Sequence, residues 1–322
     1  MTHHRFRRLA RRLVEIGLTL LGVAILVFIT LRVIPGDQIT ASLGTEAGDL
    51  TPAQIDALRA YYGIDQPLVS QFVGWLGSVL TGNLGVSQGT GQSVLDMTLS
   101  ALPITLELAV ISTAVGLAIG IPLALLSASR PNELRDAAAQ TVGLAGLAIP
   151  SFLLGSLLIA YVSKVFRYNP NSLGFARLQE DPWLNLQQLL FPALVLGFGL
   201  AAPIMRTART SLLEVQSQDF VRTAHGKGVS PGRIRTRHVL RAALIPIVTM
   251  TGIQFGYLLG GAIVVEQIFS VPGLGRQVLL GLQQKEYAVV QSTVLVIALL
   301  FVLVNLVTDQ LYRVVDPRVR AI

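Results

Sequence analysis

Residues 214–246 read EVQSQDFVRTAHGKGVSPGRIRTRHVLRAALIP, a long polar stretch with sequence apolar enough to cross a membrane on both sides. Because Lys and Arg are enriched in the cytoplasmic loops of membrane proteins, the stretch is predicted to face the cytoplasm. A loop with this much structure is also expected to dock against a partner there. Together with the two arginines just upstream it contains eight basic residues: Arg206, Arg209, Arg222, Lys227, Arg233, Arg235, Arg237 and Arg241.

The composition of the whole chain is that of a membrane protein. Of its 322 residues, 52% are hydrophobic and 13% are charged, and the mean hydropathy is +0.62. Soluble domains are about 25% charged. The net charge of +7 does not indicate nucleic-acid binding, because the basic residues flank apolar segments instead of forming a soluble basic face. With no cysteine in the sequence, disulfides, thiolate metal sites and thiol catalysis are excluded.

Six apolar segments have about the length that a transmembrane helix needs. The first has no small-residue cleavage site after it, so it is predicted to be an uncleaved span and not a signal peptide. The third is interrupted by a proline. The predicted spans are 13–34, 102–127, 137–163, 188–213, 247–268 and 288–311.

The distribution of basic residues orients these spans. The predicted inside segments hold 18 of the 25 Lys and Arg residues and the outside segments hold six, which places both termini in the cytoplasm. Short helices are predicted over 53–62 and 68–80, and loops over 164–187 and 269–287. The predicted regions are 1–34 (cytoplasmic N-terminus and first span), 35–100 (extracytoplasmic helical segment), 101–311 (core transmembrane domain with the loop 214–246) and 312–322 (cytoplasmic tail).

The sequence contains few groups that could carry chemistry. His225 and His238 lie 13 residues apart without a carboxylate at ligand spacing, so neither a metal site nor a cofactor is predicted. No GxxxxGK[ST] loop is present, so any ATP would bind to another chain. Five ionisable residues fall inside predicted spans, and all except Glu107 lie near a predicted end, where the side chain can reach the interface: Glu15, Arg32, Glu107, Glu266 and Asp309.

Small and helix-breaking residues mark the candidates for the translocation pathway. Three glycines recur at intervals of four in the fifth span, which permits close approach of a second helix. Tight packing of the bundle and lining of a pathway both fit this pattern. The candidates are Gly252, Gly256, Gly260, Gly261, Pro150 and Pro203.

Two short helices are predicted inside the polar stretch. The first covers 214–227 and ends at a C-terminal cap supplied by Gly226 or Gly228. The second begins with Ser230 as N-cap and Pro231 at its first position. The first helix presents a small, partly apolar surface that fits either anionic lipid or a protein partner.

Thr223-Ala224 followed by Gly228 resembles the EAA loop of type I ABC importer permeases, and the stretch around them resembles the dipeptide/oligopeptide branch. Six further blocks resemble that branch in the expected order: 33–37 (VIPGD), 61–77, 101–109 (ALPITLELA), 148–159 (AIPSFLLGSLLI), 269–278 (FSVPGLGRQV) and 316–320 (DPRVR). Two features depart from the general consensus. Arg222 stands where Glu is usual, and the proline comes only at Pro246.

The resemblance implies an all-α, six-span permease subunit in the cell membrane that forms half of a pathway for di- or oligopeptides. It implies a heterodimer with a homologous permease, two ATPase subunits that bind ATP and Mg²⁺, and an extracytoplasmic solute-binding protein. Import of nickel, glutathione or haem by the same architecture, a stand-alone ion-coupled carrier and a membrane scaffold remain alternatives. The residues implied to couple to the ATPase are Asp219, Phe220, Val221, Arg222, Thr223, Ala224, Lys227 and Gly228.

Overall fold

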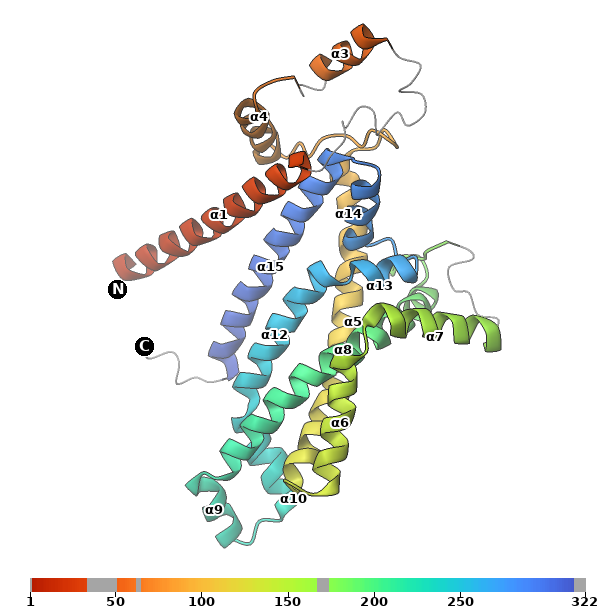
Figure 1. Cartoon of the computed structure of the whole chain (residues 1–322). Helices are drawn as coiled ribbons and strands as arrows, with labels where there is room; N and C mark the ends of the chain where they lie inside the picture. Colours follow the sequence, from red (N-terminus) through yellow and green to blue (C-terminus); the bar gives the residue numbers. More distant parts are fainter. Residues whose placement is uncertain (1, 34–50, 62–64, 167–173, 316–322) are drawn as a thin grey trace. The chain divides into compact units, whose positions relative to one another are not determined.

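The computed structural model of the chain describes residues 2–33, 51–61, 65–166 and 174–315 (Figure 1). Nearly all of them are helical, and within these ranges the only β-type pairing is an isolated bridge between Val86 and Ser93. The predicted all-α class is therefore confirmed. The predicted turn at 35–37 and residues 316–322 of the predicted tail lie outside the described ranges.

The described elements are, in chain order, α1 (Thr2–Val33), α3 (Pro52–Tyr61), α4 (Leu68–Leu80), α5 (Val94–Ser129), α6 (Leu134–Ala148), α7 (Ser151–Phe166), α8 (Pro182–Gln216), α9 (Asp219–Gly226), α10 (Pro231–Arg233), the π-helix η2 (Ile234–Val239), α11 (Leu240–Ala242), α12 (Leu244–Gly261), α13 (Ile263–Ile268), α14 (Leu274–Gln283) and α15 (Tyr287–Val315). They form two compact units. One comprises 1–103 and 273–302, and the other comprises 104–272 and 303–322.

In the first unit, α4 packs on the end of α1 through aromatic rings. The ring of Phe28 lies 5.1 Å from that of Phe72 and 6.1 Å from that of Trp75. The guanidinium of Arg32 stacks over Phe28 at 3.3 Å and donates hydrogen bonds of 3.1 and 2.9 Å to the side-chain oxygen of Gln71. Arg32, predicted to reach the membrane interface freely, is instead part of the contact between α1 and α4.

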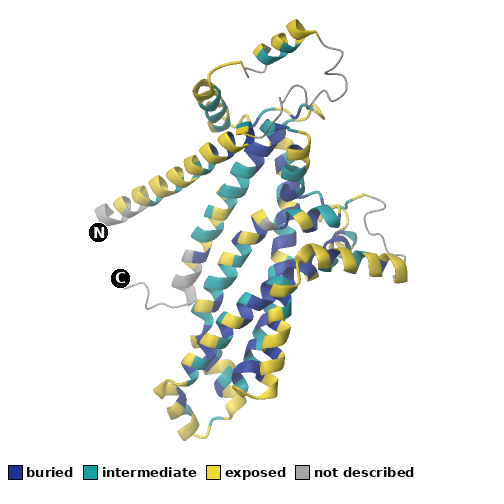
Figure 2. Ribbon diagram, in the orientation of Figure 1, coloured by how far each residue is buried: buried dark blue, intermediate teal, exposed yellow. Residues whose placement is uncertain are grey.

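In the second unit, α8 is the central helix. It contacts α6, α7, α12, α13 and η2, and Figure 1 shows α6, α8 and α12 side by side. Figure 2 colours much of α8 as buried and most of α7 and α9 as exposed. The residues that let α8 occupy this position are small, because small residues allow helix backbones to approach closely.

Glycines bring the backbones of α5 and α6 against α8. A Cβ on Gly197 would lie 2.5 Å from a methyl carbon of Val115, and one on Gly146 would lie 2.6 Å from the carbonyl oxygen of Phe198. A Cβ on Gly120 would meet the carbonyl oxygen of Ala201 at 2.9 Å. In each case a side chain would need space that a neighbouring helix already fills.

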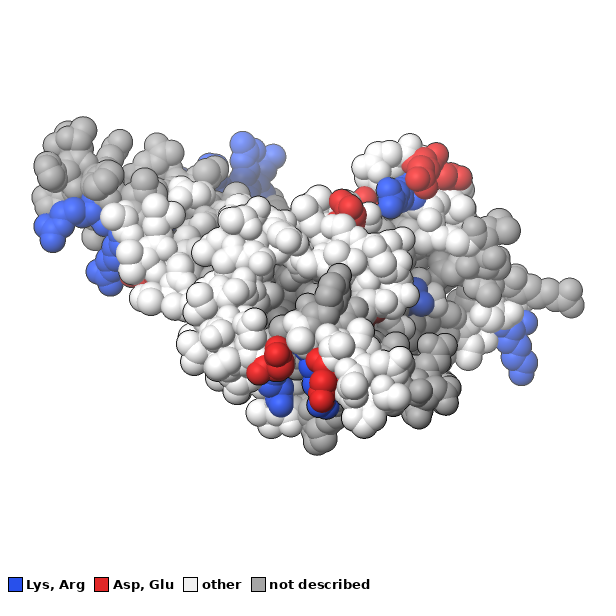
Figure 3. Space-filling model, turned by 90° about the horizontal axis from the view of Figure 1, so that it is seen from above, with Lys and Arg blue, Asp and Glu red and all other residues white. Residues whose placement is uncertain are grey.

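Four described helices are long and apolar enough to cross a membrane, and the number is six if each of two bent pairs counts as one span. The third predicted span is such a pair, since α6 and α7 bend by 93° at Pro150. The other pair bends by 59° where 231–242 meets 244–260. Most described atoms in Figure 3 belong to uncharged residues, as expected for a chain surrounded by lipid.

Three boundaries differ from the sequence prediction. The predicted loop 269–287 contains the helix α14, and α8 begins at Pro182, inside the predicted loop 164–187. The predicted helix 214–227 is broken between Gln216 and Asp219, so that α9 is a separate element. In α8 the start is set by Asp181, whose carboxylate accepts hydrogen bonds from two backbone N–H groups, a local signal that hydropathy does not register.

We expect Gly197→Ala to lower the melting temperature of the purified protein, because its Cβ would clash with Val115 and with the carbonyl oxygen of Ser112. Overpacking of this kind costs about 1–3 kcal/mol. Gly22→Ala in α1 is the matched control, since nothing lies within 4 Å of a Cβ there. Alanine normally favours a helix over glycine by about 1 kcal/mol. Equal melting temperatures for the two variants would contradict the close approach of α5 to α8.

Candidate coupling site

The implied coupling residues lie on α9 and its C-terminal turn, and α9 attaches to the second unit through one buried side chain. Val221 is 3% exposed and belongs to a core cluster contributed by α5, α6, α8, η2 and α12. Ala224, one turn later, packs partly against the same cluster. The remaining implied residues face outward and are exposed: Asp219, Phe220, Arg222, Thr223, Lys227 and Gly228.

The end of α9 is fixed by a Schellman cap. Gly228 has a φ of +74°, the left-handed conformation that glycine adopts most readily. Its N–H donates to the carbonyl of His225 at 2.9 Å, and the N–H of Val229 donates to the carbonyl of Ala224 at 3.2 Å. Of the two glycines predicted as possible caps, Gly228 therefore holds the left-handed position. The cap turns the chain sharply and leaves α9 as a short projection.

The second predicted helix of the loop is present but differs in form. Ser230 occupies the N-cap position without a capping hydrogen bond from its side chain, and Pro231 is the first helical residue. The chain then continues as the π-helix η2, whose Ile234 and Val239 are both buried in the core cluster. In an α-helix, residues five apart point about 140° away from each other. The π geometry, with its i→i+5 hydrogen bonds, brings these two side chains onto one face.

A buried ion pair ties α6 to α8 beside this cluster. The guanidinium of Arg209 binds both carboxylate oxygens of Asp136, with contacts of 2.9 and 2.7 Å. The Ser127 hydroxyl of α5 and the backbone N–H of Asn132 also donate to that carboxylate. The side chain of Asp136 is 3% exposed and that of Arg209 is 21% exposed. Three helices are thus joined at one carboxylate.

Sequence reasoning missed this pair because it assigned Arg209 to topology and Asp136 to a short loop. A signal was available in the spacing of the small residues of α6. Asp136 shares its buried face with Ala139, Gly143 and Gly146. A carboxylate in line with a stripe of small residues is predicted to face the neighbouring helix instead of solvent.

Two carboxylates at the other end of the second unit are also held in the protein. Glu266 is fully buried and accepts a hydrogen bond of 3.0 Å from the Thr105 hydroxyl, so the prediction that it reaches the membrane interface is wrong. Glu107 accepts a hydrogen bond of 3.1 Å from the Asn185 amide. A buried carboxylate is costly without such partners.

The pathway candidates do not gather with the coupling residues. Gly252 lies against Thr308 of α15 so closely that a Cβ would clash, Gly256 is buried and Gly260 is exposed. Pro150 is exposed at the bend between α6 and α7. Pro203 borders a hollow beside α8. The side-chain environment of Gly261 lies outside the described part of the chain.

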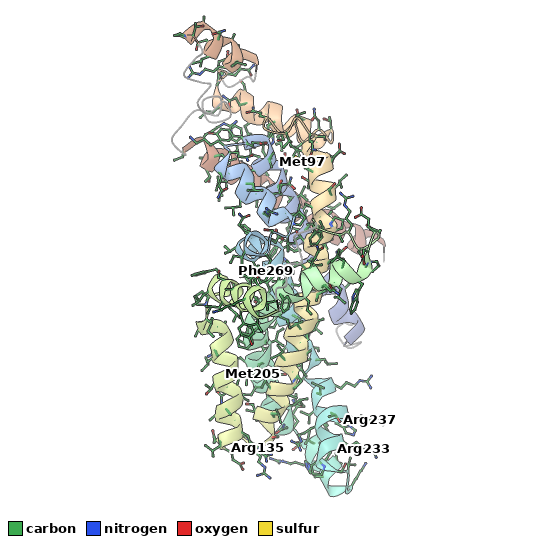
Figure 4. The ribbon with its side chains drawn as sticks, turned by 90° about the vertical axis from the view of Figure 1, so that its right-hand side faces the viewer. Met97, Arg135, Met205, Arg233, Arg237 and Phe269 are labelled. Atoms are coloured by element: carbon green, nitrogen blue, oxygen red, sulfur yellow. The ribbon has the colours of Figure 1, made fainter. Side chains whose placement is uncertain are left out.

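Basic side chains mark the α9 end of the second unit. Figure 4 shows Arg135 of α6 with Arg233 of α10 and Arg237 of η2 at that end, and Phe269 well away from it. Arg233 and Arg237 are exposed, so they remain available to solvent, lipid or a partner. Within the described residues, no three His, Asp or Glu side chains are grouped so that they could hold a metal ion.

The whole chain matches two family models of one transport system. Residues 120–321 match the family described as binding-protein-dependent transport system inner membrane component, and residues 5–109 match the N-terminal family of the same membrane component. The chain belongs to this family, and it is a multi-pass permease subunit of an ABC importer.

Curated relatives match it over nearly their full length. A putative peptide permease protein of Brucella ovis is 38% identical over 97% of this chain and 98% of that protein. The glutathione transport system permease protein GsiC of Escherichia coli (strain K12) is 36% identical over 96% of this chain and 97% of that protein. Among solved structures, a chain of the MetNI methionine ABC transporter covers 68% of this chain and 96% of its own length, with 22% identity and a TM-score of 0.52, and so shares its fold.

We expect Arg209→Gln to lower the melting temperature of the purified protein, because it leaves the buried Asp136 carboxylate without its cation. Removing one partner of a buried pair costs about 3–5 kcal/mol. The double variant Asp136→Asn/Arg209→Gln should recover part of this loss.

Arg222→Gln is the control for that measurement. Arg222 also pairs with an aspartate, at 3.6 Å from Asp219, but both side chains are largely exposed. Exposed pairs contribute little to stability. If Arg209→Gln and Arg222→Gln melted at the same temperature, the role assigned to the buried pair would be contradicted.

Proposed function

We propose that this chain forms half of the membrane pathway of an ATP-driven peptide importer, with both termini in the cytoplasm. The observation that carries the peptide assignment is the 38% identity, over nearly the whole length of both chains, to a putative peptide permease protein. The other half is a homologous permease subunit. An extracytoplasmic solute-binding protein delivers the peptide, and residues 35–100 and 269–287 face it.

Two ATPase subunits bind ATP and Mg²⁺ in this proposal, and this chain itself uses no cofactor. The ATPases contact α9 and its cap. An aromatic ring exposed beside basic side chains suits a groove on a protein better than the hydrocarbon core of a membrane. Phe220 is 42% exposed, while its neighbour Val221 anchors α9 in the core cluster. Movement of the ATPases would therefore pass through Val221 into α5, α6, α8 and α12.

Glutathione is the second candidate substrate, because the relative at 36% identity is named a glutathione transport system permease protein. Glutathione is itself a tripeptide with free carboxylates, so one pathway could accept either. Import of nickel or haem has no comparable support among these relatives. Family membership also replaces the alternatives of a stand-alone ion-coupled carrier and a scaffold.

We expect the complete transporter in proteoliposomes to take up labelled di- and tripeptides when ATP and its binding protein are supplied. Peptide uptake should exceed that of nickel or haem by at least about tenfold, a ratio that corresponds to about 1.4 kcal/mol. Omitting ATP is the control. ATP-dependent uptake of glutathione alone would shift the assignment to the second candidate, and a lack of both would reject it.

We expect Phe220→Ala to weaken co-purification of the ATPase subunits with the permease and to reduce ATP-driven uptake by about tenfold or more, since truncation of an aromatic anchor typically costs at least about 2 kcal/mol of binding. Phe152→Ala is the matched control, because Phe152 of α7 is similarly exposed and lies far along the chain from α9. Unchanged assembly and uptake in Phe220→Ala would remove α9 from the ATPase interface.

A further inference from the structure

A hollow of about 470 Å³ lies beside α8 in the second unit. Its walls are Leu147 of α6, Pro246 at the start of α12 and Met250 of α12, together with a face of α8. A volume of this size is typical of small-molecule sites, which combine mostly apolar walls with a few placed polar groups. The polar groups here come from α8.

The α8 wall is a row of polar side chains that ends in opposite charges. Arg206, Thr210 and Glu214 follow one another at intervals of four residues, and Thr207 and Ser211 stand beside them. Residues four apart lie one above the other on a helix. At 1.5 Å per residue, the cation and the carboxylate are separated by about 12 Å along the axis.

Both charges are exposed, and neither side chain has a hydrogen bond or ion pair with another residue in the described part of the chain. The contrast with Arg209 is informative. Arg209 lies three residues after Arg206 on the same helix, and Asp136 neutralises it. Arg206 instead leaves its guanidinium available at the edge of the hollow, where its planar donors match a carboxylate.

We propose that this hollow is a transient binding subsite for the cargo, in which Arg206 binds the terminal carboxylate of a peptide and Glu214 lies near its ammonium group. The inference rests on the proposed peptide importer and adds a position on the pathway to it. An extended chain covers about 3.3–3.6 Å per residue, so the 12 Å spacing suits a tri- or tetrapeptide. The hydroxyls of Thr210 and Ser211 then face the peptide backbone between the two charges.

The site also fits its place in the sequence. Arg206 and Glu214 lie at the α9 end of α8, the end proposed to face the cytoplasm. A cargo leaving the pathway needs contacts that hold it weakly, so that it can go on. One solvent-exposed ion pair contributes little affinity by itself. Arg206 therefore selects for a carboxylate without trapping the peptide.

The absence of cysteine from the sequence permits a direct test. Thr210→Cys places a unique thiol of this chain between the two charges, and its labelling is followed on the chain by mass in the assembled transporter, permease partner and ATPases included. Methanethiosulfonates of similar size but opposite charge are compared. We expect the anionic reagent to react faster relative to the cationic one, and Arg206→Gln to lower this ratio about fivefold. Arg130→Gln, at an exposed arginine outside the hollow, should leave the ratio unchanged.

Protection by cargo is the second readout. A tripeptide should slow labelling of the introduced thiol in the Thr210→Cys transporter, and Arg206→Gln should abolish this protection. An unreactive thiol would show that the partner permease covers the hollow and would overturn the proposal. A ratio that Arg206→Gln does not change would also overturn it. Loss of all ATP-driven peptide uptake in the unmodified transporter would instead reject the proposed function itself, so the two failures are distinguishable.

Discussion

The close approach of α5 and α6 to α8 is the constraint on which the second unit depends. Gly120 and Gly197 remove the side chains that would separate α5 from α8, and Gly146 does the same for α6. Within lipid there is no hydrophobic drive for helices to associate, so van der Waals contact between backbones must supply the attraction. Once the helices are this close, any polar side chain between them is shielded from lipid and from water.

That shielding gives the Arg209–Asp136 pair its importance. Its charges lie between helices, where an unpaired carboxylate would be costly, and Ser127 and Asn132 complete its hydrogen bonds. The pair stands beside the cluster that receives Val221 from α9. A displacement of α9 therefore meets helices that are already joined to one another, and they can move as a group.

Much of this architecture follows from the sequence. Apolar length and the positions of Lys and Arg predicted the spans, and the polar stretch 214–246 contains the two predicted helical parts. Hydropathy failed where structure depends on partners in space. It left α14 as a loop, it sent Glu266 to the membrane interface, and it missed the pairing of Asp136 with Arg209. The π geometry of η2 is also set by the packing of Ile234 and Val239, which no local preference encodes.

The way α9 is mounted has a mechanical consequence. It is joined to α8 through the break at 217–218 and to η2 through the left-handed turn at Gly228, and one side chain, Val221, seats it in the core cluster. A short rod held by two bends and a single socket transmits a push along the direction of the socket but resists tilting weakly. Such a joint lets a partner rotate against the membrane subunit while the load on the helices stays constant in direction.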